Sequence, residues 1–432
     1  MRKTIFLLFP FMMANMPVIA QPGDSTALKS AAVSDIQSKY DRYKAIALQI
    51  WNYAEVGYKE VKSSALLQKT LSDNGFSVKS GVAGIPTAFV ASYGSGTPVI
   101  GILAEFDALP GLSQQAVPEK MPVEGQQAGH GCGHNLFGTA STAAAIEIRD
   151  LIAQKKLSGT IRVYGCPAEE GGDGKVYMVR AGLFNDVDVV IHWHPGNANS
   201  VTMNSMLAMK SAKFRFHGLA AHAAASPDKG RSALDGVESM DYMVNMMREH
   251  IPQETRIHYV ITNGGKAPNV VPDFAEVYYY VRHPKKDEVI RIFDWVVAAA
   301  KGAALGTQTS VDYEVIGGTH ELLINRALAE DMQANLQQVG GVSYAVPTVG
   351  LEAATWVPGT PAHSWQAAAC GGMEIGFKGM MVAAKTMALT AIDCYLRPQL
   401  IARARQEFKM DKGAYQYQAL LGDRKPALNY RD

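Results

Sequence analysis

Residues 97–110, which read TPVIGILAEFDALP, constrain the fold more than any other stretch of this chain. The apolar run Val99–Leu103 is continuous rather than alternating, as expected of a strand that is covered on both faces in an α/β sheet. Asp107 follows the strand at its carboxyl end, where α/β enzymes usually place their chemistry. The sequence therefore predicts a sheet covered by helices, with a functional site at one edge.

The same pattern recurs along the next hundred residues. Residues 135–154 are rich in small residues and predict a helix, residues 159–172 predict a buried strand opening into glycines, and residues 186–196 predict another buried strand. The repeated order of strand and helix indicates a mixed, mostly parallel sheet in the α/β class. Polar side chains follow each of its strands: Asp107, Glu169 and Glu170, His192 and His194.

A chain of 432 residues is too long for one hydrophobic core, so we expect two domains. From about Met206 the predicted order is strand, helix, strand, strand, helix, strand, which is typical of a small α+β sandwich. Past Glu321 the sequence is helix-rich and resembles the first domain again. We predict a catalytic domain formed by residues 21–205 and 319–432, with an α+β domain inserted at 206–318. The charged, tyrosine-rich tail after Pro398 receives no role.

The first twenty residues, MRKTIFLLFPFMMANMPVIA, place Arg2 and Lys3 before an apolar run. This order predicts a secretory signal over residues 1–20 that is cut after Ala20, and hence a periplasmic or secreted protein. An uncleaved membrane anchor is the alternative, but the run is short and is interrupted by Pro10 and Pro17. After signal cleavage we expect no membrane contact.

Net charge and cysteine content exclude several classes. The formal net charge is +1 and no basic run occurs, so neither nucleic acid nor an anionic membrane is an expected partner. Four cysteines without regular spacing do not form a disulfide scaffold. One bridge among Cys166, Cys370 and Cys394 stays open from the sequence. The expected partner is a small molecule.

Residues 129–135, GHGCGHN, indicate a metal site. Cys132 and His134 offer a thiolate and an imidazole, which soft and borderline divalent metals prefer, and glycines let the backbone approach closely. Three other interpretations remain. The stretch could be a glycine turn with incidental histidines, or a structural zinc site, although that usually needs a Cys-x-x-Cys unit. Cys132 could also be a nucleophile with His134 as its base.

The acidic pair Glu169 and Glu170 lies where a predicted strand runs into glycines. Neighbouring side chains at a strand end diverge, so one carboxylate could bind metal while the other faces an attacking water, although a solvated pair is the simpler alternative. His192 and His194 lie two residues apart on one face of a strand, so spacing cannot choose between them. His363, in GTPAHSW, adds a donor from a distant segment.

The chain resembles the M20 metallopeptidases, and within them the amidohydrolase branch of aminobenzoyl-glutamate and auxin-conjugate hydrolases. The resemblance covers residues 35 to 397 and is carried by motifs in the family's order: IWNYAEVGYKE, ILAEFDALPG, GHGCGHNLFGTA, PAEEGGDGK, HGLAAHAAASPDKGRSALDGVE, APNVVPDFAEVYYYVR and GTPAHSW.

The resemblance implies a centre of two divalent ions, zinc or manganese. The implied ligands are Cys132, His134, Glu170, His194 rather than His192, and His363. Glu169 is implied to be the general base. Many relatives have histidine where this chain has Glu105, so that ligand is absent and Asp107 is expected to support a ligand rather than bind metal itself.

The family's inserted domain acts as a lid and forms a homodimer, which the resemblance implies here too. His222 is implied to reach across the dimer to the oxyanion of the reaction, and Asn269 and Arg282 to hold the carboxylate of the released amino acid. We therefore expect metal-dependent hydrolysis of an amide in N-acyl amino acids or dipeptide-like substrates, such as aminobenzoyl-glutamate. The alternatives are a cysteine-nucleophile hydrolase and a non-catalytic periplasmic binding protein with the same fold.

Overall fold

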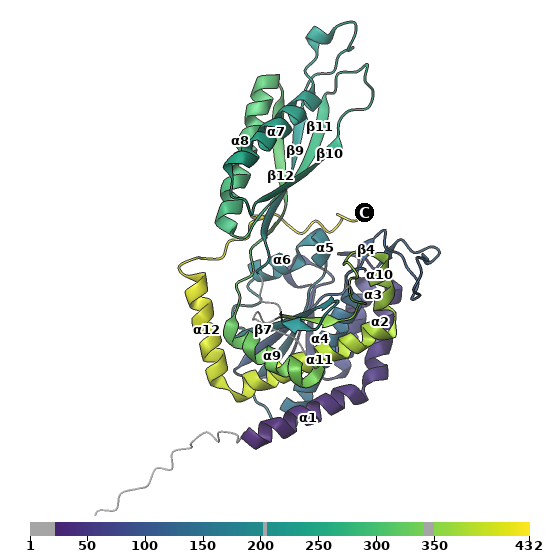
Figure 1. Cartoon of the computed structure of the whole chain (residues 1–432), viewed down its shortest axis with the longest axis vertical. Coiled ribbons are helices and arrows are strands. Elements are labelled where there is room, and N and C mark those ends of the chain that lie inside the picture. The colour runs from purple at the N-terminus through teal and green to yellow at the C-terminus, as the bar shows by residue number, and fades with distance from the viewer. Residues whose placement is uncertain (1–21, 202–204, 341–349) are drawn as a thin grey trace, which may run out of the picture.

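The computed structural model describes residues 22–201, 205–340 and 350–432, and Figure 1 shows two units, each built around its own sheet. The predicted signal, residues 1–20, lies outside the described residues. The first unit holds the longer sheet and most of the helices, and the second unit extends away from it. The chain passes from the first unit to the second and back again.

The first sheet has seven strands in the order β1-β2-β6-β3-β7-β13-β8. Its four neighbours β6, β3, β7 and β13 are parallel, and the other pairs are antiparallel. Its strands are β1 (Ser77–Ser80), β2 (Phe89–Gly94), β3 (Val99–Ala104), β6 (Thr160–Gly165), β7 (Val189–Gly196), β8 (Ser200–Val201) and β13 (Gly350–Ala354). Five of the six residues of β3 are buried, which confirms the prediction of a strand covered on both faces in a mostly parallel α/β sheet.

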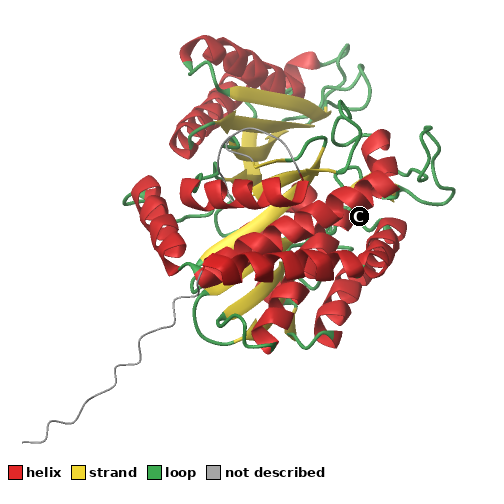
Figure 2. Ribbon diagram, turned by 60° about the horizontal axis from the view of Figure 1, so that its bottom comes forward, coloured by secondary structure: helices red, strands yellow, loops and turns green. Residues whose placement is uncertain are grey.

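Helices cover both faces of this sheet, as Figure 2 shows. They are α1 (Pro22–Ser38), α2 (Tyr40–Tyr53), α3 (Val61–Asp73), α4 (His134–Ala153), α5 (Glu169–Gly172), α6 (Gly174–Arg180), α9 (Arg326–Gly340), α10 (Trp365–Gly371), α11 (Glu374–Leu396) and α12 (Pro398–Lys412). Among the described helices, α11 alone is long and apolar enough to cross a membrane, but 78% of its most apolar window is buried inside the protein. It is therefore a core helix of the first unit.

The second sheet is antiparallel, with strand order β10-β11-β9-β12. Its elements are β9 (Ala208–His217), α7 (Ala233–Met247), β10 (Arg256–Asn263), β11 (Phe274–His283), α8 (Lys286–Thr307) and β12 (Ser310–Thr319). This is the order of strands and helices expected from the sequence. Along β11 every second residue is buried beneath α7 and α8, because only one face of the sheet is covered by helices.

The return segment after Glu321 contains a strand that the sequence did not reveal. Strand β13 has five residues and pairs in parallel with β7, so that Glu352 lies opposite His194. A segment this short, which contains a glutamate, does not show the long apolar run of a central strand. Two further strands, β4 (Leu109–Pro110) and β5 (Ala128–Gly129), form a small antiparallel pair, and β5 ends three residues before Cys132.

Candidate metal centre

The glycine-rich turn before α4 sets the position of two donors. Gly133 has φ +75°, and a Cβ built at this position would lie 2.8 Å from the Pro195 ring. A larger residue would therefore be strained both by the left-handed backbone and by the contact with Pro195. Cys132 precedes this turn and His134 begins α4, and both are buried. The dense glycines of this stretch therefore allow a thiol and an imidazole to share one small space.

Two groups of donor atoms meet at Cys132. The first group is Cys132, His134 and His194, and the second is Cys132, Glu170 and His363; within each group the donor atoms lie within 4.8 Å of one another. Cys132 Sγ is 3.4 Å from His194 Nε2, and His363 Nε2 is 3.2 Å from Glu170 Oε1. One sulfur thus lies between two sets of nitrogen and oxygen donors.

The structure distinguishes His194 from His192. Both side chains lie on the same face of β7, as their spacing predicted. The His192 ring packs against β13 instead, where a Cβ built on Gly350 would lie 2.4 Å from it. Burial lowers the pKa of His192 to about 4, so this ring is neutral. His194 is the one that reaches Cys132.

Asp107 contacts two residues of the donor cluster, His134 and Glu170. Its Oδ1 lies 2.9 Å from His134 Nδ1, and its Oδ2 accepts a hydrogen bond of 2.9 Å from the Glu170 backbone N–H. Burial opposes ionisation of Asp107, but the neighbouring His134 and these hydrogen bonds lower its pKa below the usual value. The contact makes Nδ1 of His134 the donor and directs Nε2 to the cluster, as in metal sites where a carboxylate orients a histidine ligand.

Glu105 and Lys175 belong to the site, although sequence reasoning assigned them no role in it. A third group of clustered donors is Glu105, His134 and Glu169. Glu105 Oε2 lies 3.1 Å from His134 Nε2, and its other oxygen accepts a 2.5 Å bond from Lys175 Nζ. The available signal was the position of Glu105, two residues before Asp107 at the carboxyl end of a buried strand.

The cluster is charged in a way that suits both metal binding and base catalysis. Burial alone would raise the pKa of Cys132, but His134, His194 and His363 lower it to about 6, so the thiolate form is favoured. Burial and the charge of Glu105 raise the pKa of Glu169 to about 7, although its side chain is 39% exposed. A carboxylate with a pKa near neutrality can both accept and return a proton.

The donor set fits a pair of divalent ions. Three buried atoms in the cluster, Glu105 Oε2, His134 Nε2 and Glu170 Oε1, make ion-pair contacts of 3.1 to 3.2 Å but no hydrogen bond with the described residues. Buried polar atoms are almost always satisfied in folded proteins, so these orphaned atoms indicate a missing partner. Sulfur and nitrogen donors suit zinc, and the carboxylates are also compatible with manganese.

The predicted substrate residues lie on the second unit. The Asn269 carbonyl accepts a 3.0 Å hydrogen bond from the Ala223 backbone N–H, which joins the loops that carry Asn269 and His222. His222 is exposed, and its Nδ1 accepts from the backbone N–H groups of Ala224 and Ala225 at 3.2 Å. In the neutral ring the proton is then on Nε2, which can donate a hydrogen bond.

Arg282 lies at the opposite end of the second sheet from these loops. It pairs with Met209 near the start of β9, whereas Phe274, which follows the Asn269 loop, pairs with His217 at the end of β9. Eight residues of strand separate the two positions, roughly 26 Å at 3.3 Å per residue. Within one chain the structure therefore brings His222 and Asn269 together but not Arg282, and it places all three on the second unit.

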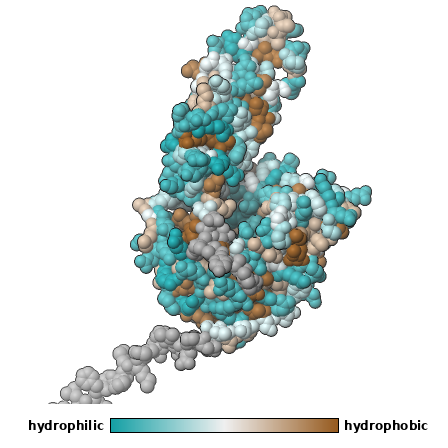
Figure 3. All heavy atoms as spheres, viewed as in Figure 1, coloured by the Kyte–Doolittle hydropathy of each residue, from teal (hydrophilic) through white to brown (hydrophobic). Residues whose placement is uncertain are grey.

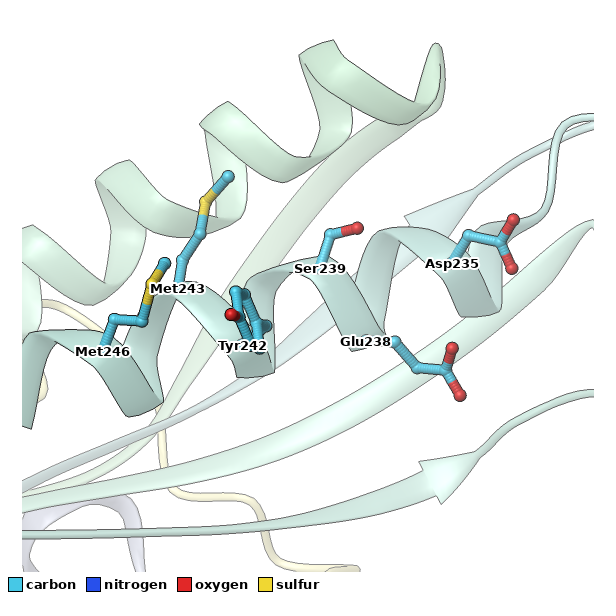
Figure 4. Close-up of a pocket in the computed structure, with 6 residues that line it drawn as sticks. All are labelled: Asp235, Glu238, Ser239, Tyr242, Met243 and Met246. Carbon is cyan, nitrogen blue, oxygen red and sulfur yellow. The ribbon is translucent and has the colours of Figure 1, made fainter.

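A shallow hollow of about 540 Å³ lies along α7, far from the cluster in the sequence and on the other unit (Figure 4). Its lining contains no histidine or cysteine and consists of Asp235, Glu238, Ser239, Tyr242, Met243 and Met246. The donor cluster is therefore the better candidate for chemistry.

All four cysteines are free thiols, so no bridge joins Cys166, Cys370 and Cys394.

Comparisons with known proteins show which family the chain resembles. The model of Peptidase family M20/M25/M40 matches residues 101–376. The chain is 38% identical to one of the subunits of the p-aminobenzoyl-glutamate hydrolase of Escherichia coli, over 86% of this chain and 93% of that protein. It is 29% identical to the Xaa-Arg dipeptidase of mouse, over 90% of this chain and 95% of that protein.

Solved structures share the fold. An aminobenzoyl-glutamate utilization protein from Klebsiella pneumoniae superposes with a TM-score of 0.60 at 18% identity, covering 84% of this chain and 98% of the other. A dinuclear metal-binding peptidase from Bacillus subtilis gives 0.59 at 17% identity, covering 83% and 99%.

Proposed function

The chain belongs to peptidase family M20, as a hydrolase acting on amide bonds, and from this premise we propose that it is a dinuclear metalloenzyme cleaving N-acyl amino acids or dipeptide-like substrates. The observation that carries the proposal is the position of Cys132 between two donor sets. Its thiolate would be shared by both ions. His134 and His194 would hold one ion, and Glu170 and His363 the other.

When bound, the two ions would polarise the scissile carbonyl and lower the pKa of the attacking water. Glu169 accepts the proton from that water. Its carboxylate lies beside the proposed ligand His134, 3.9 Å from Nε2, and its pKa is raised to about 7. The same carboxyl group then passes the proton to the leaving amine. Glu105 and Lys175 form a charged pair near this carboxylate, and the negative charge of Glu105 contributes to its raised pKa.

A homodimer would complete the site. The exposed Nε2–H of His222 suits the developing oxyanion, and the planar fork of Arg282 suits a substrate carboxylate. Since His222 and Asn269 lie at the far end of the second sheet from Arg282, the first two would come from the partner subunit. In this arrangement neither subunit has a complete site alone.

Exposed apolar side chains on the second unit support the homodimer, and Figure 3 shows hydrophobic patches on this unit. On α7, Tyr242 is 67% exposed and Met246 51%. The edge strand β10 exposes Tyr259, Val260 and Ile261. An apolar helix face and an unpaired strand edge on one unit are typical of an interface between copies.

The substrate is inferred from the named relatives. One relative is a subunit of a p-aminobenzoyl-glutamate hydrolase and another is an Xaa-Arg dipeptidase, so both names describe an amide next to an amino acid carboxylate. The higher identity to the first favours an aminobenzoyl-glutamate type of substrate.

We also propose export to the periplasm or medium on the basis of residues 1–20, which amino-terminal sequencing of the purified protein would test.

Substitution of the base separates this mechanism from a cysteine nucleophile. Glu169→Gln should lower kcat on aminobenzoyl-glutamate by about 10²–10⁴-fold with little change in metal content, because the amide cannot accept the proton. The exposed Glu254→Gln is the matched control and should retain full activity. A different result would show that the thiol is the nucleophile and that the proposal is wrong: Glu169→Gln remains active, while Cys132→Ala is inactive although it still binds metal.

A further inference from the structure

The segment after α12, residues 413–432, runs back across the second unit toward the metal centre. Leu421 is buried against β12, where a Cβ built on Gly318 would lie 2.7 Å from the Leu421 nitrogen. Arg424 donates a hydrogen bond to the backbone of β12 and forms an ion pair with Glu314 at 3.3 Å. We call residues 413–432 the tail, and these contacts fix its middle part against β12.

The tail then crosses α6 and reaches the loop that carries the acidic pair. The hydroxyl of Tyr177 donates to the Lys425 carbonyl at 3.2 Å, and Arg180 donates to the Gly422 carbonyl at 2.7 Å. The Tyr430 ring packs edge-on against the Tyr58 ring, with centroids 5.5 Å apart. These contacts bring the end of the tail to the loop of residues 166–173, which carries Glu169 and Glu170.

That loop has an unfavourable backbone. Ala168 has φ +53° and Asp173 has φ +57°, in the left-handed region that residues other than glycine rarely adopt. Conformations of this kind persist only where surrounding contacts fix them. Two buried carboxyl groups hold the loop from one side: Glu60 accepts from the Ala168 N–H at 2.7 Å, and Asp107 accepts from the Glu170 N–H at 2.9 Å.

The tail fixes the same loop from the other side. The Glu170 carbonyl accepts a 2.9 Å hydrogen bond from the Tyr430 hydroxyl and a 2.5 Å bond from the Arg431 guanidinium. Tyr430 occupies space that only a glycine leaves open, because a Cβ on Gly57 would lie 2.1 Å from its hydroxyl. Both backbone groups that flank the Glu170 side chain are therefore held, one by Asp107 and one by the tail.

We propose that Tyr430 and Arg431 are positioning residues that hold the Glu170 carbonyl, and through it the Glu170 carboxylate, in the place where that carboxylate can bind metal. The inference rests on the proposed function of Glu170. A change of a few tenths of an ångström in this peptide would move the carboxylate relative to Cys132 and His363. Sequence reasoning had left the tail without a role.

The test uses four variants of the full-length protein. Three remove hydrogen bonds: Tyr430→Phe, Arg431→Gln and the double variant that combines them. The fourth, Arg431→Lys, keeps a donor at position 431. Zn²⁺ affinity is measured by competition with a chromophoric chelator, and kcat and KM with aminobenzoyl-glutamate. We expect the double variant to bind one of its two ions about 10–100-fold more weakly. Its kcat should fall while KM changes less than about twofold. Arg431→Lys should recover much of the loss, because an ammonium can still donate to the carbonyl.

Tyr417→Phe is the matched control, since Tyr417 lies in the tail but packs on His320 rather than on the loop, and it should behave as wild type. If the double variant does not fold, Tyr430→Phe alone decides, with an expected loss of about 3–10-fold for one hydrogen bond. A folded variant with unchanged ion affinities and kcat would overturn the inference. Wild-type protein that binds no metal would instead defeat the proposed function itself.

Discussion

At the scale of single residues, Asp107 contacts both sides of the candidate centre. One oxygen meets His134 Nδ1 and the other accepts from the Glu170 N–H, so one buried carboxylate sets the positions of two donors that belong to different groups. Carboxylates in this position orient a histidine and increase its basicity. The centre depends on this residue although it need not touch an ion.

Asp107→Asn should therefore weaken metal binding without removing a ligand. We expect the affinity for Zn²⁺ to fall about 10–100-fold, and hydrolysis to recover when metal is added in excess. The exposed Asp73→Asn, which only breaks a surface pair with Lys69, is the matched control. Equal affinities in the wild type and Asp107→Asn, measured by chelator competition, would show that Asp107 has no orienting role.

Sequence reasoning found the donors that stand in unusual local patterns. Cys132 and His134 were visible because glycines surround them, and Glu169 and Glu170 because they are adjacent at a strand end. Spacing could not separate His192 from His194, since the choice depends on β13 packing over His192. Glu105 and Lys175 were missed because their contacts join segments 70 residues apart.

At the scale of elements, the packing of α1 against α4 contains a second acidic cluster. Asp35 on α1 faces Glu147 and Asp150 on α4, and Lys39 pairs with Asp35 and Asp150. Burial first, then the hydrogen bond with Asp35, raises the pKa of Glu147 to about 9. The folded protein thus keeps a proton that the unfolded chain would release.

The sign of the resulting pH dependence follows from linkage. Below the unfolded pKa of about 4.5 the contribution of Glu147 to stability is fully present, and it is lost as the pH rises toward 9. Glu147→Gln should keep the hydrogen bond without needing the proton. Its urea midpoint relative to wild type should therefore increase between pH 5.5 and 8.5. Parallel pH dependences for the two proteins would show that Glu147 does not keep its proton in the folded state.

Elements with many buried apolar residues were predictable, and those that depend on partners were not. The continuous apolar run of β3 and the small residues of α4 signalled a covered parallel sheet. Strand β13 has only five residues, and it is a strand because β7 offers it a pairing edge. No local pattern carries that information.

At the scale of the whole molecule, the proposed dimer distributes one site over two chains. In a heterodimer of Glu169→Gln and His222→Ala, one site lacks both groups and the other regains both. Random mixing of equal amounts should therefore restore about a quarter of wild-type activity from two inactive proteins. The check is co-refolding followed by a hydrolysis assay. No recovery in a sample shown to contain mixed dimers would place His222 in the site of its own chain or outside catalysis.

The proposed enzyme would hold two divalent ions at the donor sets that meet at Cys132. The most direct test is elemental analysis of the purified protein, combined with hydrolysis of a panel of N-acyl glutamates before and after chelation. We expect about two zinc or manganese ions per chain, with activity lost on chelation and restored by metal. Metal-free protein that still hydrolyses the panel would contradict this expectation and direct attention to Cys132 as a nucleophile.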